Sequence, residues 1–366
     1  MNADELLTAA REDLARGFTA RAGTRLRQAG DAGNSQALVE LASAVFRGRV
    51  PGSAREIRQR LESLSELVPA AHLLRARWRY AGTGGEAASD SALADIGVAA
   101  TAGDRAAQIE IALAWNEFAG TDARRQVHAW LLAAGAVDEF GLREATAQPV
   151  DSDPAALPDA WAPLPVCAEP QILASEPDIR VAPDLLSPFE CIWLCRHAAA
   201  RLAPSRVIDP LTGRSLDDPI RTGLTACLDP AQPGVFDLRI SERMAQAAGS
   251  TLGHAEPLAV LRYLPGEQYK PHYDWLDKAG LARDPLAAAG DRAITVLAYL
   301  NTPEAGGTTH FPRLDIRVPA RRGQVLVFAN VDSRATPSAL AQHAGEPVIA
   351  GEKWIASLWL RERRLS

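Results

Sequence analysis

The chain divides into two stretches that differ in the spacing of their hydrophobic residues. From Asp4 to about Arg143, apolar residues recur at the three- and four-residue intervals of amphipathic helices, among many Ala, Leu, Arg and Glu residues. From about Leu185 onward, short β-branched runs alternate with turn residues, a pattern typical of strands. The sequence therefore predicts a multidomain α + β protein.

The helical stretch contains a loose internal repeat. Segments 37–48, 71–82 and 107–120 each begin with Ala and end in an aromatic residue, one further residue and Gly. Their final glycines lie 34 and 38 residues apart, close to the repeat length of helical-hairpin solenoids. We expect residues 1–145 to form a solenoid-like helical repeat domain, which resembles degenerate tetratricopeptide or Sel-like repeats.

Such a domain has two functional interpretations. Stacked helical hairpins build a concave surface, which is either a docking platform for a protein substrate or a scaffold and dimerisation module. Trp78, Trp115 and Trp130 are expected in its core rather than as peptide-gripping residues.

Eight prolines fall between Pro149 and Pro183. Proline continues neither a helix nor a central strand, so we expect residues 146–183 to be an extended, semi-rigid linker. The composition is equally compatible with a strap packed along one domain.

The second stretch predicts strands at 258–264, 268–272, 293–301, 308–311, 324–328 and 352–359, and a helix at 188–202. Short strands spaced by turns are typical of a double-stranded β-helix, or jelly roll. We assign this fold to residues 184–366. Because it places an early strand beside a late one, it brings distant residues together.

His272 and Asp274 are two residues apart, and His343 follows His272 by 71 residues. Two imidazoles and one carboxylate form the three-ligand face that non-haem Fe(II) oxygenases use. On a strand, side chains two apart project to the same face, so the close pair is able to hold one ion. The spacing predicts an iron site.

The motifs around these residues resemble the catalytic domain of the prolyl 4-hydroxylase family, within the Fe(II)- and 2-oxoglutarate-dependent dioxygenases. The matching residues span roughly half the chain and are Arg221-Thr222, Tyr263, Gly266, Tyr269, His272, Asp274, Arg292, Thr295, Tyr299-Leu300-Asn301, Gly306-Gly307, Thr309, Phe311, His343, Pro347-Val348, Gly351 and Lys353-Trp354.

The resemblance implies that His272, Asp274 and His343 are the iron ligands and catalytic centre. It implies that Lys353 pairs with the distal carboxylate of 2-oxoglutarate, since a buried dianion requires a partner. Dioxygen is the second co-substrate, and ascorbate is an expected accessory. The presence of Asp274 favours hydroxylation, because related halogenases lack this carboxylate.

Further roles follow from the same resemblance. Tyr263, Tyr299 and Thr309 match residues that line the co-substrate pocket, although both tyrosines are equally compatible with plain core positions. Trp359 matches an aromatic residue on the substrate side of the iron, although it too is compatible with a plain core position. Arg221 either pairs with substrate or braces a loop.

The implied activity is hydroxylation of a C–H bond, with release of succinate and carbon dioxide. We expect a prolyl residue of a protein or peptide as the target, with docking by the helical repeats. The alternatives are an oxygenase of a small molecule or natural-product peptide, and a non-catalytic scaffold. His310, beside Thr309, is expected to be a bystander to the metal site.

Whole-chain properties add few constraints. The net charge of −6 gives no electrostatic case for nucleic acid. The start of the sequence lacks a signal-peptide pattern, and no apolar run is long enough to span a bilayer, so we expect a cytoplasmic protein. The four cysteines do not form a disulfide framework, and the sequence leaves the oligomeric state undetermined.

Overall fold

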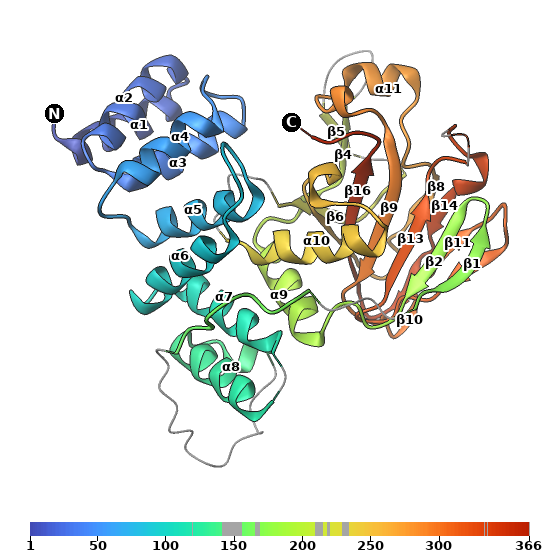
Figure 1. Cartoon of the computed structure of the whole chain (residues 1–366). Coiled ribbons are helices and arrows are strands. Elements are labelled where there is room, and N and C mark those ends of the chain that lie inside the picture. The colour runs from blue at the N-terminus through green and yellow to red at the C-terminus, as the bar shows by residue number, and fades with distance from the viewer. Residues whose placement is uncertain are drawn as a thin grey trace. The chain divides into compact units, whose positions relative to one another are not determined.

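The computed structural model describes residues 1–118, 120–140, 156–164, 169–208, 215–217, 220–228, 234–332, 334 and 336–365. The chain forms two compact units (Figure 1). One unit comprises Met1–Pro163 with Pro230–Phe236, and the other comprises Leu164–Asp229 with Asp237–Ser366. The first is helical and the second holds the strands, so the α + β prediction is confirmed at this level.

In the helical unit, each helix packs against the next along the chain. The helices are α1 (Ala3–Ala15), α2 (Thr19–Asp31), α3 (Ser35–Phe46), α4 (Ala54–Ser63), α5 (Pro69–Ala81), α6 (Ser89–Thr101), α7 (Arg105–Asn116) and α8 (Thr121–Ala133).

The repeated glycines of the sequence mark helix ends. Gly82 ends α5 with a φ of 71°, and Gly48 follows α3 with a φ of 66°. Both angles lie in the left-handed region, where a residue with a side chain is strained. The 34-residue spacing therefore reflects two helices that are each followed closely by a glycine in this conformation.

The predicted positions of the tryptophans are largely confirmed. Trp78 and Trp130 are buried, whereas Trp115 is half-buried. The indole Nε1 groups of Trp115 and Trp130 each donate to the carbonyl oxygen of Ala156, both at 3.0 Å. The residues from Ala156 to Pro163 thus pack along the helical unit, as in the strap interpretation.

The second unit is built on an antiparallel sheet of eight strands, in the order β1-β2-β13-β9-β16-β7-β6-β3. The strands are β1 (Gln171–Ser175), β2 (Asp178–Ala182), β13 (Val325–Ala329), β9 (Arg292–Tyr299), β16 (Lys353–Arg361), β7 (Ala259–Tyr263), β6 (Leu224–Cys227) and β3 (Ala203–Pro204).

A second sheet has four strands in the order β12 (Ile316–Val318), β11 (Thr309–Phe311), β14 (His343–Gly345) and β8 (Tyr269–His272). Two further pairs are β10 (Ala305–Gly306) with β15 (Val348–Ala350), and β4 (Arg206–Ile208) with β5 (Ser215–Asp217). Leu261 and Leu297 of the large sheet share one hydrophobic core with Phe311 and Val318 of the small sheet.

The end of the predicted linker is part of the large sheet. Strands β1 and β2 form a hairpin, and β2 also pairs with β13, so it is an interior strand. The structure accommodates the prolines because Pro170 precedes β1, Pro177 lies in the turn and Pro183 follows β2. Each of these positions spares the ladder hydrogen bonds that proline cannot donate.

Two helices of this unit are α9 (Pro188–Ala199), close to the predicted helix, and α10 (Phe236–Ala247). A capping box of Ser187 and Glu190 starts α9, which packs on β6 and β7. Cys191, on α9, is buried, and burial raises the pKa of its thiol to about 12. This agrees with an inert core thiol.

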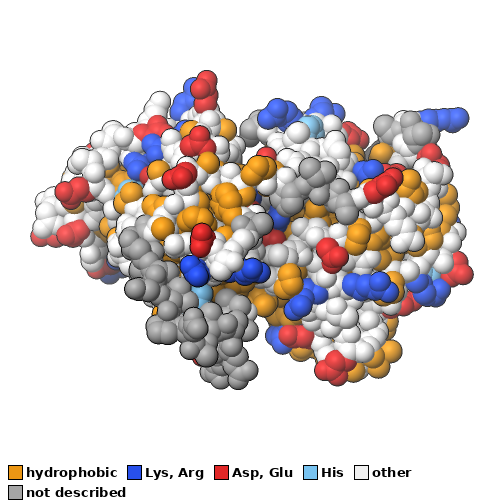
Figure 2. All heavy atoms as spheres, turned by 60° about the horizontal axis from the view of Figure 1, so that its bottom comes forward, with side chains coloured by type: hydrophobic (Ala, Val, Ile, Leu, Met, Phe, Trp, Pro, Cys, Tyr) orange, Lys and Arg blue, Asp and Glu red, His pale blue; other side chains and the backbone are white. Residues whose placement is uncertain are grey.

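Acidic and basic side chains are interspersed on the face shown in Figure 2. Within the part of the chain that the structure describes, every helix is too short or too polar to cross a membrane.

Candidate active site

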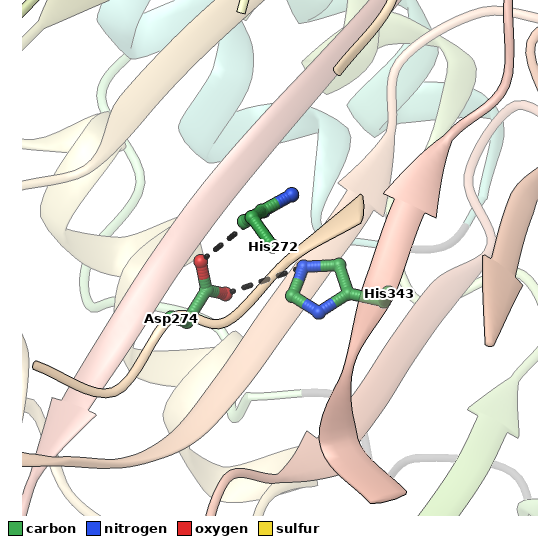
Figure 3. A group of neighbouring side chains, drawn as sticks. All are labelled: His272, Asp274 and His343. Atoms are coloured by element: carbon green, nitrogen blue, oxygen red, sulfur yellow. Dashed lines mark ion pairs between the residues drawn. The ribbon is translucent and has the colours of Figure 1, made fainter. Parts of the chain in front are cut away.

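The structure brings His272, Asp274 and His343 together. Strand β14 pairs with β8 so that His343 lies opposite His272 in the ladder. The sequence predicted Asp274 on the same strand as His272, but β8 ends at His272 and Asp274 lies two residues beyond it. Figure 3 shows both imidazoles directed toward the carboxylate of Asp274.

The imidazoles are oriented by backbone carbonyl groups. Nδ1 of His272 lies 2.7 Å from the carbonyl oxygen of Lys270, and Nδ1 of His343 lies 3.1 Å from that of Ala341. A carbonyl only accepts, so each Nδ1 carries the proton and each Nε2 keeps its lone pair.

Both lone pairs face a carboxylate. Nε2 of His272 is 3.6 Å from Oδ1 of Asp274, and Nε2 of His343 is 3.6 Å from Oδ2. All three side chains are at most 9% exposed, and their ligand atoms lie within 4.8 Å of one another. Three electron-pair donors facing one another away from water repel unless a cation lies between them. This donor set therefore fits Fe(II).

Burial and charge act against each other here. Burial alone would raise the pKa of Asp274. In acid, where the imidazoles of His343 and His272 are protonated, their positive charge outweighs burial and holds that pKa below its usual range. Burial, together with the neighbouring His272, lowers the pKa of His343 to about 4, despite the opposing charge of Asp274. At neutral pH the site thus offers an ionised carboxylate and a neutral His343.

Asp274 is supported by two residues of the large sheet. The hydroxyl of Thr295, on β9, donates to Oδ2 of Asp274 at 2.7 Å. Nδ2 of Asn330, which directly follows β13, donates to the Thr295 hydroxyl at 2.9 Å. Thr295 and Asn330 are both 0% exposed. Thr295 is one of the residues that carry the family resemblance, but neither it nor Asn330 had an expected role.

A cavity opens at this cluster. Four alternate residues of β16, which are Lys353, Ile355, Ser357 and Trp359, line it together. Side chains two apart on a strand share a face, so β16 forms a wall with a cation at one end and an indole at the other. The remaining lining residues are Arg221, Leu261, Tyr263, Gln268, Tyr269, His272, Asp274, Leu297, Thr309, His343, Gly345 and Glu346.

Lys353 places a buried cation in the cavity. Its side chain is 3% exposed, and Nζ lies 5.7 Å from the ring centroid of Tyr299. Burial lowers the pKa of Lys353 to about 8, although the carboxylate of Glu346 acts in the opposite direction. Such an ammonium favours an anionic ligand, because an anion would restore the stability of its charged form.

The residues expected to line the co-substrate pocket separate into two groups. Tyr263 and Thr309 line the cavity, and Tyr263 lies opposite Lys353 in the ladder of β7 and β16. Tyr299 is fully buried behind Thr309 and donates its hydroxyl to Oγ1 of Thr309 at 2.8 Å. Tyr299 therefore supports the wall rather than forming it.

The expected substrate-side residues also reach the cavity. Trp359 lines it, with the guanidinium of Arg292 lying 4.1 Å from the centre of its ring system. Arg221 lines it too, and its guanidinium lies 5.3 Å from the ring centroid of Tyr269. Tyr269 in turn stacks on His272, with 3.3 Å between ring centroids.

His310 does not join the metal cluster. Its Nδ1 lies 3.4 Å from Glu346 and its Nε2 lies 3.9 Å from Asp315. The alternation of β11 explains this, because neighbouring Thr309 faces the cavity.

Comparisons with known proteins agree with this geometry. A family described as the 2OG-Fe(II) oxygenase superfamily matches residues 258–361. Prolyl 4-hydroxylase 1 of Arabidopsis thaliana is 31% identical over 215 residues, covering 54% of this chain and 74% of that protein. Prolyl 4-hydroxylase subunit alpha-1 of Rattus norvegicus is 31% identical over 180 residues, covering 49% of this chain and 34% of that subunit.

Among solved structures, the collagen prolyl hydroxylase of Paramecium bursaria chlorella virus 1, in its 2OG complex, is similar to this chain. The identity is 27% and the TM-score is 0.39, over 50% of this chain and 95% of that chain.

The donor set and the family matches define a 2-oxoglutarate-dependent dioxygenase, whose metal is Fe(II) and whose co-substrate is 2-oxoglutarate. Within the 2OG-Fe(II) oxygenase superfamily, the chain belongs to the prolyl 4-hydroxylase family.

Proposed function

We propose that this protein hydroxylates a prolyl residue of a protein or peptide, using 2-oxoglutarate and dioxygen and releasing succinate and carbon dioxide. The observation that carries the proposal is one cavity that holds a buried two-histidine, one-carboxylate cluster and a buried lysine. We infer a prolyl substrate because the relatives are prolyl 4-hydroxylases. Ascorbate is the proposed accessory reductant.

His272, Asp274 and His343 are the proposed iron ligands, through Nε2 of each imidazole and the carboxylate. Bound iron supplies the redox chemistry that activates dioxygen and oxidises a C–H bond. The protein orients the ligands through the carbonyl groups of Lys270 and Ala341. It also excludes water, because the donor atoms lie at the base of a cavity rather than on the surface.

Lys353 is the proposed partner of the distal carboxylate of 2-oxoglutarate. Its ammonium is buried at the start of β16, and Tyr263 and Thr309, which carry hydroxyl groups, line the same cavity. We propose that these groups orient a carboxylate by charge and hydrogen bonding. Arg221 and Trp359, which also line the cavity, are proposed to contact the substrate.

The two sheets that share one core support a double-stranded β-helix for residues 184–366. The succession of packed helices in residues 1–145 supports a solenoid-like repeat. We propose residues 146–183 as the connection between the two domains, with residues 171–182 joining the sheet.

We propose that the helical repeat docks the protein substrate. Apolar side chains exposed on this unit include Val98 on α6 (50% exposed) and Leu132 on α8 (65% exposed). If either contributes to docking, Val98→Asp or Leu132→Asp should raise the KM for a protein substrate and leave the KM for a short peptide unchanged. If both variants keep the wild-type KM for the protein substrate, docking at these residues is contradicted.

The test of the reaction is succinate formation from 2-oxoglutarate by the Fe(II)-loaded full chain, with and without a proline-rich peptide. Mass spectrometry of the peptide detects the added oxygen atom. His343→Ala should abolish both signals, whereas His310→Ala, a matched substitution outside the cluster, should keep them. Succinate without peptide oxidation would point to a small-molecule or natural-product substrate. A wild-type protein that binds neither Fe(II) nor 2-oxoglutarate would point to a scaffold.

A further inference from the structure

The carboxylate of Asp274 has two oxygen atoms, and the structure distinguishes them. Oδ2 accepts the hydrogen bond of Thr295 at 2.7 Å. Oδ1 lies 3.6 Å from Nε2 of His272, which keeps its lone pair, and none of the described residues donates a hydrogen bond to this oxygen. The two oxygen atoms are therefore chemically unequal before any metal binds.

The direction of the Thr295 hydrogen bond is fixed by the residue behind it. A hydroxyl has one proton to give. Because Nδ2 of Asn330 donates to the Thr295 oxygen at 2.9 Å, the Thr295 proton is left for Asp274. The reversed amide would place the Oδ1 acceptor of Asn330 against Thr295 and set two acceptors in competition for one proton.

Asn330 is itself held in place. Its backbone N–H donates to the carbonyl of Ala293 at 2.8 Å, and its backbone carbonyl accepts from Ser338 at 2.9 Å. Its side-chain Oδ1 is buried and has no hydrogen-bond donor within the described residues. A buried unpaired acceptor lowers stability. The Asn330 side chain carries this unfavourable term while its Nδ2 group donates to Thr295.

We propose that Thr295, held by Asn330, positions Asp274 so that it binds the metal through Oδ1 alone. Binding through both oxygens would occupy a second coordination position, and the class requires open positions for its co-substrates. Thr295 is thus a positioning residue, which acts on the metal through Asp274. The inference rests on the proposed iron site.

The test uses Co(II), whose visible absorption reports its coordination number, in the full-length protein. Thr295→Val removes the hydroxyl and keeps the side-chain shape, so it should weaken Co(II) binding about 10- to 100-fold. It should also lower the Co(II) absorption intensity, as expected when Asp274 adds a second oxygen ligand. Thr295→Ser retains the hydroxyl and should restore both the affinity and the spectrum.

A matched control is Thr225→Val on β6 of the same sheet, because the Thr225 hydroxyl lies 2.9 Å from the Ser205 hydroxyl. It should leave Co(II) affinity and spectrum unchanged. If Thr295→Val folds, as judged by circular dichroism, and binds Co(II) with wild-type affinity and spectrum, the positioning role is wrong. Failure of the wild-type protein to bind Co(II) would instead overturn the proposed iron site.

Discussion

Replacing Lys353 with Met should stabilise the ligand-free protein while it removes binding of 2-oxoglutarate. Burial lowers the pKa of Lys353 from 10.5 to about 8. Each pKa unit corresponds to about 1.4 kcal/mol, so at pH 7 the buried ammonium costs about 3–4 kcal/mol. Methionine keeps an unbranched chain of similar length but carries no charge.

One favourable contact is lost with the charge. Nζ lies 5.7 Å from the ring centroid of Tyr299, and a buried cation–π contact contributes about 0.5–2 kcal/mol. The net gain in the free energy of unfolding should therefore be about 1–3 kcal/mol at pH 7.

The gain should depend on pH in a defined direction. A folded-state pKa below the unfolded value means that the folded protein holds fewer protons between about pH 8 and 10.5. Wild-type stability should therefore rise with pH across this window. The advantage of Lys353→Met should be complete below pH 8 and should fade as the pH rises toward 10.5.

Hydrogen exchange of the β16 amides, followed by mass spectrometry, measures the stability of this sheet separately from the helical unit. Lys270→Met, at an exposed lysine on β8, is the matched control and should show no such gain. With Mn(II) present, 2-oxoglutarate at 100 times its Kd should stabilise wild type by about 2.7 kcal/mol and the Lys353 variant far less. A Lys353 variant that is less stable than wild type at pH 7, or that is stabilised equally by 2-oxoglutarate, would refute the reasoning.

Three further perturbations test the surrounding structure. The metal-free protein should lose stability as the pH falls below 6.5, because burial lowers the pKa of His343 to about 4 and the pKa of Asp274 is also lowered. Unfolding measured at a series of acidic pH values checks this, and a free energy of unfolding that does not change with pH would contradict it. Tyr299→Phe removes the hydrogen bond to Thr309 and should cost about 1 kcal/mol with a rise in the KM for 2-oxoglutarate; an unchanged KM would separate Tyr299 from the pocket. Arg361→Met removes one guanidinium partner of the buried Glu256 carboxylate, which keeps Arg292, and should cost about 1–3 kcal/mol. Urea unfolding measures this loss, and an unchanged free energy of unfolding would show that the Arg361–Glu256 ion pair is not stabilising.

The strands that carry the site were predictable because their signals are local. The runs that became β7, β9, β13 and β16 are apolar and end at turn residues, so each prediction falls close to the observed strand. Pairing of β8 with β14 then follows from the fold and places His343 opposite His272.

The remaining features depend on contacts that no local pattern encodes. Asn330 has no distinguishing neighbours in the sequence, and it reaches Thr295 only because β13 pairs with β9. The depth of Tyr299 behind Thr309 depends in the same way on how the two sheets pack. Strand β2 was not predicted because the high proline content of residues 146–183 argues against a strand. The strand forms because the prolines lie outside it and in the turn of the hairpin.

The charges in the cavity explain why iron and 2-oxoglutarate should support each other. Asp274 and Lys353 contribute one negative and one positive charge, and both are buried. Iron alone adds two positive charges to this interior, and the co-substrate alone adds two negative charges, so each single ligand leaves an uncompensated charge that is costly to bury. The two ligands together cancel. The penalty at Lys353 in the empty cavity is thus relieved most fully when both are bound, and a site built in this way couples their binding.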